Sequence, residues 1–307
     1  MAREVQAAAA VLMIRPEAFA SNPQTLGSNA FQSSGGGRTT AARARAEFAG
    51  LVEALRSNRV EVHLFEGRAE RDAPDEVFPN NWVSTHADGT VVVYPLMAEN
   101  RRVERRVELL ETLTTESAYR VSRVIDLTAH ERRQRYLEGT GSLVLDRVHR
   151  LAYANLSPRT HLDVLGEFSQ RLDYEVISFE AVDEQHRPIY HTNAVMSVGT
   201  GFAVICAAAI STPAKRAAVL AALRSCGREV IELRPAQLRS FAGNLLEVAT
   251  PDGPLIVLSA GAWQALDEGQ RGALRRHGKI AAPAVPTIER FGGGSVRCML
   301  AEIHLPR

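Results

Sequence analysis

Hydrophobic and polar residues alternate along the chain in two patterns, one typical of helices and one typical of strands. Five amphipathic or alanine-rich segments have the spacing of helices; they span residues 39–58, 98–117, 158–172, 213–227 and 259–277. Each is followed by a short apolar run that predicts a strand, at residues 60–65, 119–127, 174–179, 228–233 and 279–284. Further strand-like runs precede the helices, at residues 7–14, 90–95, 141–146 and 201–206.

The order of these segments repeats. Helix starts recur about every 46 to 60 residues, a period expected when one supersecondary unit is repeated around an axis. A doubly wound α/β sheet would also alternate helix and strand. However, the chain has neither G-x-G-x-x-G nor a P-loop at a strand-to-helix turn. We therefore predict an α/β fold of five strand–strand–helix–strand units. Since no clean linker divides the chain, we expect residues 1–307 to form one catalytic domain.

Composition excludes several classes of partner. The 307 residues are 45% hydrophobic and 23% charged, with a formal net charge of +1, so we expect no nucleic acid and no acidic membrane surface as partner. The first apolar run ends at Arg15 and is too short to span a membrane. Three cysteines, at 206, 226 and 298, have no metal-ligand spacing and are odd in number. We therefore expect a cytoplasmic protein with free thiols, no metal and no cofactor.

A low-complexity segment rich in Ser and Gly lies between the first strand and the first helix, at residues 21–38. Loops of this length are usually lids or disordered inserts. Asn29, Phe31 and Gln32 offer an aromatic ring and two amides that could hold a ligand. We therefore predict a mobile lid over residues 22–37, with a disordered insert as the alternative.

Polar clusters stand at the ends of strands, where a repeat architecture would bring them together. They are P-D-E-V-F-P-N-N-W-V-S (74–84), L-E-G-T-G-S-L-V-L-D (137–146), Y-H-T-N-A-V-M-S-V-G (190–199) and G-G-G-S-V-R-C-M (292–299). Cys298, His191 and Glu138 would suit covalent catalysis, as thiolate nucleophile, acid–base group, and a carboxylate that orients the histidine or holds substrate N–H groups. Each also has a structural interpretation: a small buried hydrophobe on a strand, a histidine before an apolar strand, and a turn residue.

In this order, the motifs G-G-G-S-V-R-C-M, L-E-G-T-G and H-T-N-A-V resemble those of the guanidino-group-modifying enzyme superfamily. Its members include arginine deiminases, dimethylarginine dimethylaminohydrolases, amidinotransferases and succinylarginine dihydrolase, and the chain is most similar to the citrulline-utilisation hydrolase branch. The resemblance implies a five-bladed pseudosymmetric α/β propeller, the pentein fold, built from ββαβ units. It also implies that Cys298, His191 and Glu138 are the catalytic set.

The resemblance further implies two arginines that hold a substrate α-carboxylate. One is Arg159 in L-S-P-R-T, and the other is Arg101 or Arg102 in R-R-V-E. The bidentate guanidinium suits a carboxylate, whereas the alternative for Arg101 and Arg102 is a solvated helix face. Arg159 is expected at a helix start, where a cation opposes the macrodipole, and this favours a functional role.

Two positions depart from the arginine deiminase pattern. Those enzymes have carboxylates where this chain has Asn81 and Asn193, which leaves Asp75 and Glu138 as candidate acids. A buried guanidinium needs paired carboxylates, whereas an amide can pair with a neutral ureido group. We therefore predict hydrolysis of citrulline to ornithine, carbon dioxide and ammonia through a covalent intermediate on Cys298.

Alternatives to this prediction remain open. One is a deiminase or dihydrolase that acts on arginine or an N-substituted arginine, and the other is a catalytically silent pentein that serves as a binding module. The expected partner is a small amino-acid substrate. The sequence does not decide the oligomeric state, and a homodimer is one alternative.

Overall fold

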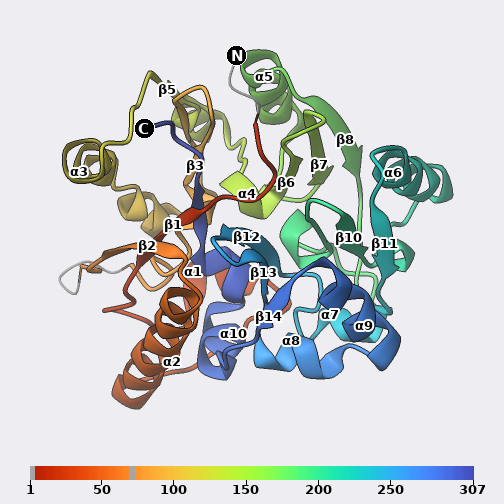
Figure 1. Ribbon diagram of the computed structural model, residues 1–307. Helices are drawn as coiled ribbons and strands as arrows, with labels where there is room; N and C mark the ends of the chain where they lie inside the picture. Colours follow the sequence, from red (N-terminus) through yellow and green to blue (C-terminus); the bar gives the residue numbers. More distant parts are fainter. Residues whose placement is uncertain (1–3, 69–72) are drawn as a thin grey trace.

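The computed structural model describes residues 4–68 and 73–307. Five three-stranded sheets are arranged around a common centre, with the longer helices on the outside (Figure 1). The first sheet contains β1 (Ala10–Ile14), β2 (Glu61–Phe65) and β15 (Ala301–Ile303). The others contain β3 (Val83–Thr85), β4 (Thr90–Val93) and β5 (Arg123–Asp126); β6 (Leu143–Asp146), β7 (Leu151–Asn155) and β8 (Glu175–Phe179); β9 (Met196–Val198), β10 (Phe202–Ile205) and β11 (Glu229–Glu232); and β12 (Leu246–Thr250), β13 (Gly253–Val257) and β14 (Lys279–Ala281).

Every sheet has the same topology. Its middle strand pairs antiparallel with one neighbour and parallel with the other. A parallel pair needs a crossover connection, which a helix usually supplies. The crossovers are α2 (Arg38–Ser57), α3 (Glu108–Ser117), α5 (Leu162–Leu172), α6 (Pro213–Ser225), and α8 (Ala260–Ala265) with α9 (Glu268–His277). The predicted α/β fold of five ββαβ units is confirmed.

The ring closes where the two ends of the chain meet. β15 pairs antiparallel with β1, with Ala10 opposite Ile303 and Leu12 opposite Ala301, and Figure 1 shows the red and blue strands side by side. This pairing fixes the segment just before β15, which contains Cys298, beside the first unit of the fold.

Apolar side chains fill the space between each sheet and its crossover helix. In the third unit, for example, Leu165 and Phe168 of α5 belong to the same buried cluster as Leu143 and Leu145 of β6. This burial follows the amphipathic pattern from which the helix was predicted. No helix of the described residues is long and apolar enough to cross a membrane.

Short helices and 3-10 turns complete the structure. They are α1 (Pro23–Leu26), α4 (Gly139–Ser142), α7 (Pro235–Leu238), α10 (Pro286–Gly292), η1 (Pro79–Asn81), η2 (Glu99–Glu104), η3 (Thr128–Arg133), η4 (Thr192–Ala194), η5 (Ala207–Ala209) and η6 (Val296–Met299). Of these, η1, α4, η4 and η6 lead into the first strand of a unit and carry the four predicted polar motifs. Cys298 thus lies in η6 and not on a strand.

Three predicted helices have different bounds. The segment 98–117 divides into η2 and α3, and 259–277 divides into α8 and α9 because Asp267 caps a new helix together with Gln270. The helix predicted at 158 begins at Leu162, with His161 as its N-cap. Arg159 therefore precedes the helix, and the macrodipole argument for it was wrong.

Candidate active site

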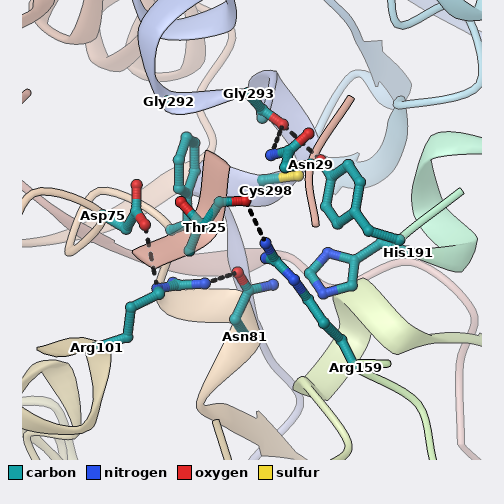
Figure 2. Close-up of a pocket in the computed structure, with 13 residues that line it drawn as sticks. Thr25, Asn29, Asp75, Asn81, Arg101, Arg159, His191, Gly292, Gly293 and Cys298 are labelled. Atoms are coloured by element: carbon teal, nitrogen blue, oxygen red, sulfur yellow. Dashed lines mark hydrogen bonds and ion pairs between the residues drawn. The ribbon is translucent and has the colours of Figure 1, made fainter. Parts of the chain in front are cut away.

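A small cavity lies among the short turns at the centre of the ring (Figure 2). Its free volume is about 10 Å³. Its walls are formed by Thr25, Asn29, Asp75, Phe78, Asn81, Arg101, Arg159, Tyr190, His191, Gly292, Gly293, Gly294 and Cys298. The cavity thus brings together residues from six separate segments of the chain, and seven of the lining residues were predicted as site residues.

The glycine run 292–294 permits close packing beside the cavity. Gly293 has a φ of 65° and ends α10. A Cβ atom at Gly293 would lie 2.4 Å from Asn29 Nδ2, and one at Gly294 would lie 2.9 Å from the ring of Phe78. Only glycine permits both the left-handed backbone and these contacts. The run therefore lets the segment around Asn29 rest directly on the approach to Cys298.

The sulfur of Cys298 is held by two side-chain amides. The residue is 3% exposed. Asn193 Nδ2 lies 3.5 Å and Asn244 Nδ2 lies 3.3 Å from Sγ. Arg297, the residue before Cys298, directs its guanidinium at the Thr140 carbonyl at 3.1 Å. Direct polar contact with the sulfur thus comes from the amides.

His191 is oriented by Glu138. The ring Nε2 lies 2.9 Å from Glu138 Oε2. Burial would raise the pKa of Glu138, but Arg159, His191 and Arg101 outweigh burial and hold it well below its usual range. Since an ionised carboxylate can only accept, Nε2 carries the hydrogen and Nδ1 is the acceptor. Burial lowers the pKa of His191 to about 4, so the imidazole is a neutral base at pH 7.

Glu138 itself lies behind the cavity wall. It is fully buried, and its Oε1 accepts a hydrogen bond from the Met97 N–H at 3.1 Å. Its Oε2 lies 3.4 Å from Arg159 Nη1 and 3.7 Å from Arg101 Nη1. Of the two roles predicted for this carboxylate, this geometry fits orientation of His191, since His191 and the arginines stand between it and the cavity.

The two candidate arginines at 101 and 102 point in different directions. Arg101 is 2% exposed and contacts both carboxylate oxygens of Glu104, at 2.8 to 3.1 Å. It also lies 3.6 Å from Asp75 Oδ2 (Figure 2). Arg102 is partly exposed and lies 3.3 Å from Glu131 Oε2, away from the cavity. The structure thus places Arg101, and not Arg102, at the cavity, a choice that the sequence left open.

Asp75 presents an unused acceptor. Its side chain is buried, and its Oδ2 accepts from Asn22 Nδ2 at 2.7 Å. Within the described residues its Oδ1 has no hydrogen-bond partner, and the same is true of Asn193 Oδ1. Burial raises the pKa of Asp75, and Arg101 offsets part of that effect. Both unpaired oxygens are suited to accept from N–H groups of a ligand.

The amides at 81 and 193 are partly committed within the protein. Asn81 Oδ1 accepts from Arg101 Nη1 at 2.9 Å, and its Nδ2 donates to Asn80 Oδ1 at 3.0 Å. Asn193 uses its N–H for the sulfur of Cys298. The oxygen of Asn81 is therefore occupied, whereas Asn193, among the described residues, keeps an unpaired Oδ1 and one unused amide hydrogen.

The segment predicted as a lid is docked against the cavity. Asn29 Nδ2 donates to the Gly293 carbonyl at 3.0 Å, and Gln32 Nε2 donates to the Phe291 carbonyl at 2.9 Å. Phe31 packs 5.9 Å from the ring of Tyr190. Asn29 lines the cavity, whereas Phe31 and Gln32 support the segment from outside it.

Arg159 links this segment to the catalytic candidates. Its Nη2 lies 2.7 Å from Ser28 Oγ and 3.4 Å from the Thr25 carbonyl, while Nη1 reaches Glu138. Its guanidinium also lies 4.9 Å from the centre of the Tyr190 ring. One cation therefore contacts both the lid segment and the carboxylate that orients His191.

Sequence reasoning missed Asn244, Tyr190 and Thr25. Asn244 had a signal, because A-G-N-L-L places a polar residue just before a strand, as P-N-N-W-V and H-T-N-A-V do. Tyr190 precedes His191 in the quoted motif. Thr25 contributes a backbone carbonyl, and the identity of its side chain gives no indication of that.

A second group of polar side chains lies away from the cavity. Possible metal-ligand atoms of Asp146, His149 and Cys226 lie within 4.8 Å of one another. Arg228 Nη1, however, lies 2.6 Å from Asp146 Oδ2 and 3.4 Å from His149 Nδ1. The guanidinium of Arg228 thus supplies the positive charge that balances Asp146 in this group.

Comparisons with known proteins agree with the fold and with the predicted superfamily. Residues 15–305 match the family model described as N,N-dimethylarginine dimethylhydrolase, eukaryotic. A search of curated protein sequences found no match.

Among solved structures, the substrate-bound N-terminal domain of a mutant ArgZ, an arginine dihydrolase from the ornithine–ammonia cycle in cyanobacteria, has a TM-score of 0.74 at 18% identity. The match covers 96% of this chain and 99% of that one. Unliganded AgrE has a TM-score of 0.73 at 20% identity, over 96% of this chain and 39% of AgrE. A dimethylarginine dimethylaminohydrolase adduct with S-methyl-L-thiocitrulline has a TM-score of 0.65 at 15% identity, over 95% and 98%.

Proposed function

The chain belongs to the N,N-dimethylarginine dimethylhydrolase family, and from this premise we propose that it hydrolyses the guanidino group of arginine or an N-substituted arginine. Family membership confirms the predicted guanidino-modifying superfamily and the predicted class, a hydrolase that acts on carbon–nitrogen bonds. The names of two structural neighbours, an arginine dihydrolase and a dimethylarginine dimethylaminohydrolase, support the guanidino substrate.

The unpaired, buried carboxylate oxygen of Asp75 carries this proposal. A guanidinium is rich in N–H donors and carries a positive charge. Asp75 Oδ1 and Asn193 Oδ1 are acceptors without partners among the described residues. A ureido oxygen would instead need donors, and Asn81 and Asn193 each already use one of their two amide hydrogens within the protein. The supply of free acceptors therefore favours a guanidinium.

The buried charges around the cavity support the same substrate. Two guanidiniums, of Arg101 and Arg159, stand among three carboxylates, of Asp75, Glu104 and Glu138. Counted as ionised, these groups have formal charges that sum to −1. Burial raises the pKa of Glu104 to about 8, but Arg101 contacts both of its oxygens at 2.8 to 3.1 Å and favours the ionised form. Arginine carries a net charge of +1, whereas zwitterionic citrulline carries none. Because unpaired charge is costly in a low-dielectric site, arginine complements this set better than citrulline does.

The proposed reaction begins with proton transfer from Cys298 to His191. The thiolate attacks the guanidinium carbon, and His191 returns the proton to the leaving nitrogen, which departs as ammonia or an alkylamine. His191 then takes a proton from water, which attacks the S-linked carbon. Cleavage of the carbon–sulfur bond releases citrulline and restores the thiol. A second round on the ureido group would give ornithine, carbon dioxide and another ammonia.

Arg101 and Arg159 are proposed to bind the substrate α-carboxylate. Both line the cavity and present guanidinium groups, which suit a planar carboxylate. Glu138 now holds both arginines from behind. We propose that the arginines keep this contact when a substrate carboxylate binds, because each guanidinium has donors to spare.

Citrulline remains the second candidate. It is favoured by the amides at Asn81 and Asn193, where arginine deiminases have carboxylates. The test is to incubate purified protein with arginine, Nω,Nω-dimethylarginine, succinylarginine and citrulline, and to measure citrulline, ornithine, ammonia and dimethylamine. Cys298→Ser serves as the blank. Turnover of citrulline without turnover of any guanidino compound would refute the proposal, and binding without turnover would indicate a silent module.

A further inference from the structure

We propose that Asn244 is a catalytic residue that stabilises the thiolate form of the nucleophile. Its side-chain amide donates to the sulfur of Cys298, and together with Asn193 it forms a pair of N–H donors around that atom. This inference rests on the proposed role of Cys298 in the reaction, and it adds a residue that none of the predicted motifs contains.

The orientation of the Asn244 amide is fixed by its other contacts. Asn244 is 1% exposed. Its Oδ1 accepts from the backbone N–H of Arg297 at 3.1 Å, which only the oxygen end of the amide can do. The NH₂ group must therefore face the other way. Its two hydrogens serve the Asn193 carbonyl at 3.1 Å and Cys298 Sγ at 3.3 Å.

The backbone around Asn244 is packed to permit these contacts. A Cβ atom at the preceding Gly243 would lie 2.8 Å from the Ala194 carbonyl oxygen. Only glycine allows the segment before β12 to come this close to the turn that carries Asn193. Asn244 thus joins three turns, its own, that of Asn193 and that of Cys298, at the sulfur.

Two amide donors favour the charged form of a thiol. An amide NH₂ can only donate, so it stabilises a thiolate and offers nothing to the hydrogen of a neutral thiol. Hydrogen bonds to ionised groups are also the stronger ones. Within residues 4–68 and 73–307, Asn193 and Asn244 are the hydrogen-bond donors that reach this sulfur. The pair is therefore placed to make Cys298 reactive before substrate binds.

The experiment measures reactivity of the sulfur without any substrate. Full-length protein is treated with iodoacetamide from pH 5 to 10, and alkylation of Cys298 is followed by mass spectrometry of its peptide. Asn244→Asp keeps the shape of the side chain and the acceptor for Arg297, but loses both donors when ionised. Asn244→Leu removes donors and acceptor together. We expect the pH of half-maximal alkylation to rise by about one to two units in both variants.

Asn155→Asp is the matched control. Asn155 is also fully buried and bridges two segments through backbone contacts, from Ala181 N–H at 2.7 Å and to the Ile189 carbonyl at 2.6 Å. It makes no contact with the sulfur of Cys298. It should lower the melting temperature as the Asn244 variants do, but leave the alkylation profile unchanged.

Each outcome decides the proposal. If Asn244→Asp titrates as the wild type does, or if Asn155→Asp shifts the profile equally, Asn244 is structural and the proposal is overturned. If Asn244→Leu does not fold, Asn244→Asp alone decides. Failure of the proposed function would show differently, because the wild-type protein would then turn over no guanidino compound, whatever the alkylation profile of the Asn244 variants.

Discussion

Replacement of Asp75 by Asn is the sharpest test of the substrate charge. Asp75→Asn keeps the size of the side chain and can still accept from Asn22 Nδ2, which lies 2.7 Å away. It removes the negative charge, which changes the formal sum around the cavity from −1 to 0. We therefore expect the variant to fold and to lose preference for a cationic guanidinium, while a neutral ureido group is affected little.

The size of the effect follows from the bond that is lost. A hydrogen bond to a charged group is worth about 1.5–3 kcal/mol. Since each 1.36 kcal/mol corresponds to a factor of ten in rate, kcat/KM for arginine should fall about 10- to 150-fold. For citrulline an amide can replace the carboxylate as partner of the ureido group, and we expect a change of less than about tenfold.

Glu76→Gln is the matched control. Glu76 is also a buried carboxylate, but it accepts from the backbone N–H groups of Glu17 at 3.3 Å and Arg68 at 3.1 Å, outside the cavity. Steady-state kinetics with both substrates should leave its arginine-to-citrulline ratio as in the wild type. Equal losses for arginine and citrulline in Asp75→Asn would refute the reasoning, since the lost contact would then be to a part that both substrates share.

Three further predictions concern the nucleophile, the lid and pH. Cys298→Ser should abolish turnover with an unchanged circular dichroism spectrum, and brief iodoacetamide treatment should modify Cys298 before the more exposed Cys226; activity lost without modification of Cys298 would contradict this. Residues 22–37 should gain protection from hydrogen exchange when ligand binds, and unchanged exchange at saturation would leave no lid. Burial lowers the pKa of His191 and of His86 to about 4, against about 6.5 when unfolded. As pH falls from 6.5 to 4 the unfolded chain therefore binds more protons, and urea titrations should show the unfolding free energy falling by up to about 1.4 kcal/mol per pH unit for each histidine.

The repeat architecture could be predicted because it depends on local patterns of hydrophobic and polar residues. Helices such as α2 and α6 were found within one or two residues from apolar spacing alone. The places of the four polar motifs in the fold could also be predicted, because each motif stands just before a strand. The pairing of β1 with β15 could not be read in this way, since its registry depends on contacts between the two ends of the chain.

Side-chain contacts around the cavity could not be predicted from the sequence either. Arg101 and Arg102 are adjacent and chemically identical, and only the phase of η2 decides that Arg101 faces Glu104 and the cavity. Asn81 was assigned to a substrate because nothing in its own motif shows that Arg101 would occupy its oxygen. An amide can pair with almost any polar neighbour, so its role depends on side chains brought from other units.

The amide at 193 has a better explanation than a preference for a ureido group. Its N–H lies 3.5 Å from the sulfur of Cys298. A carboxylate there would place a second negative charge beside the thiolate, and two like charges 4 Å apart repel by about 4 kcal/mol at an effective dielectric constant of 20. The charge needed for a guanidinium is instead retained at Asp75, on another segment of the cavity wall. The amide at 193, where deiminases have a carboxylate, can therefore stabilise the thiolate of Cys298. Whether the site prefers a charged or a neutral substrate then depends on the total charge of the groups around the cavity.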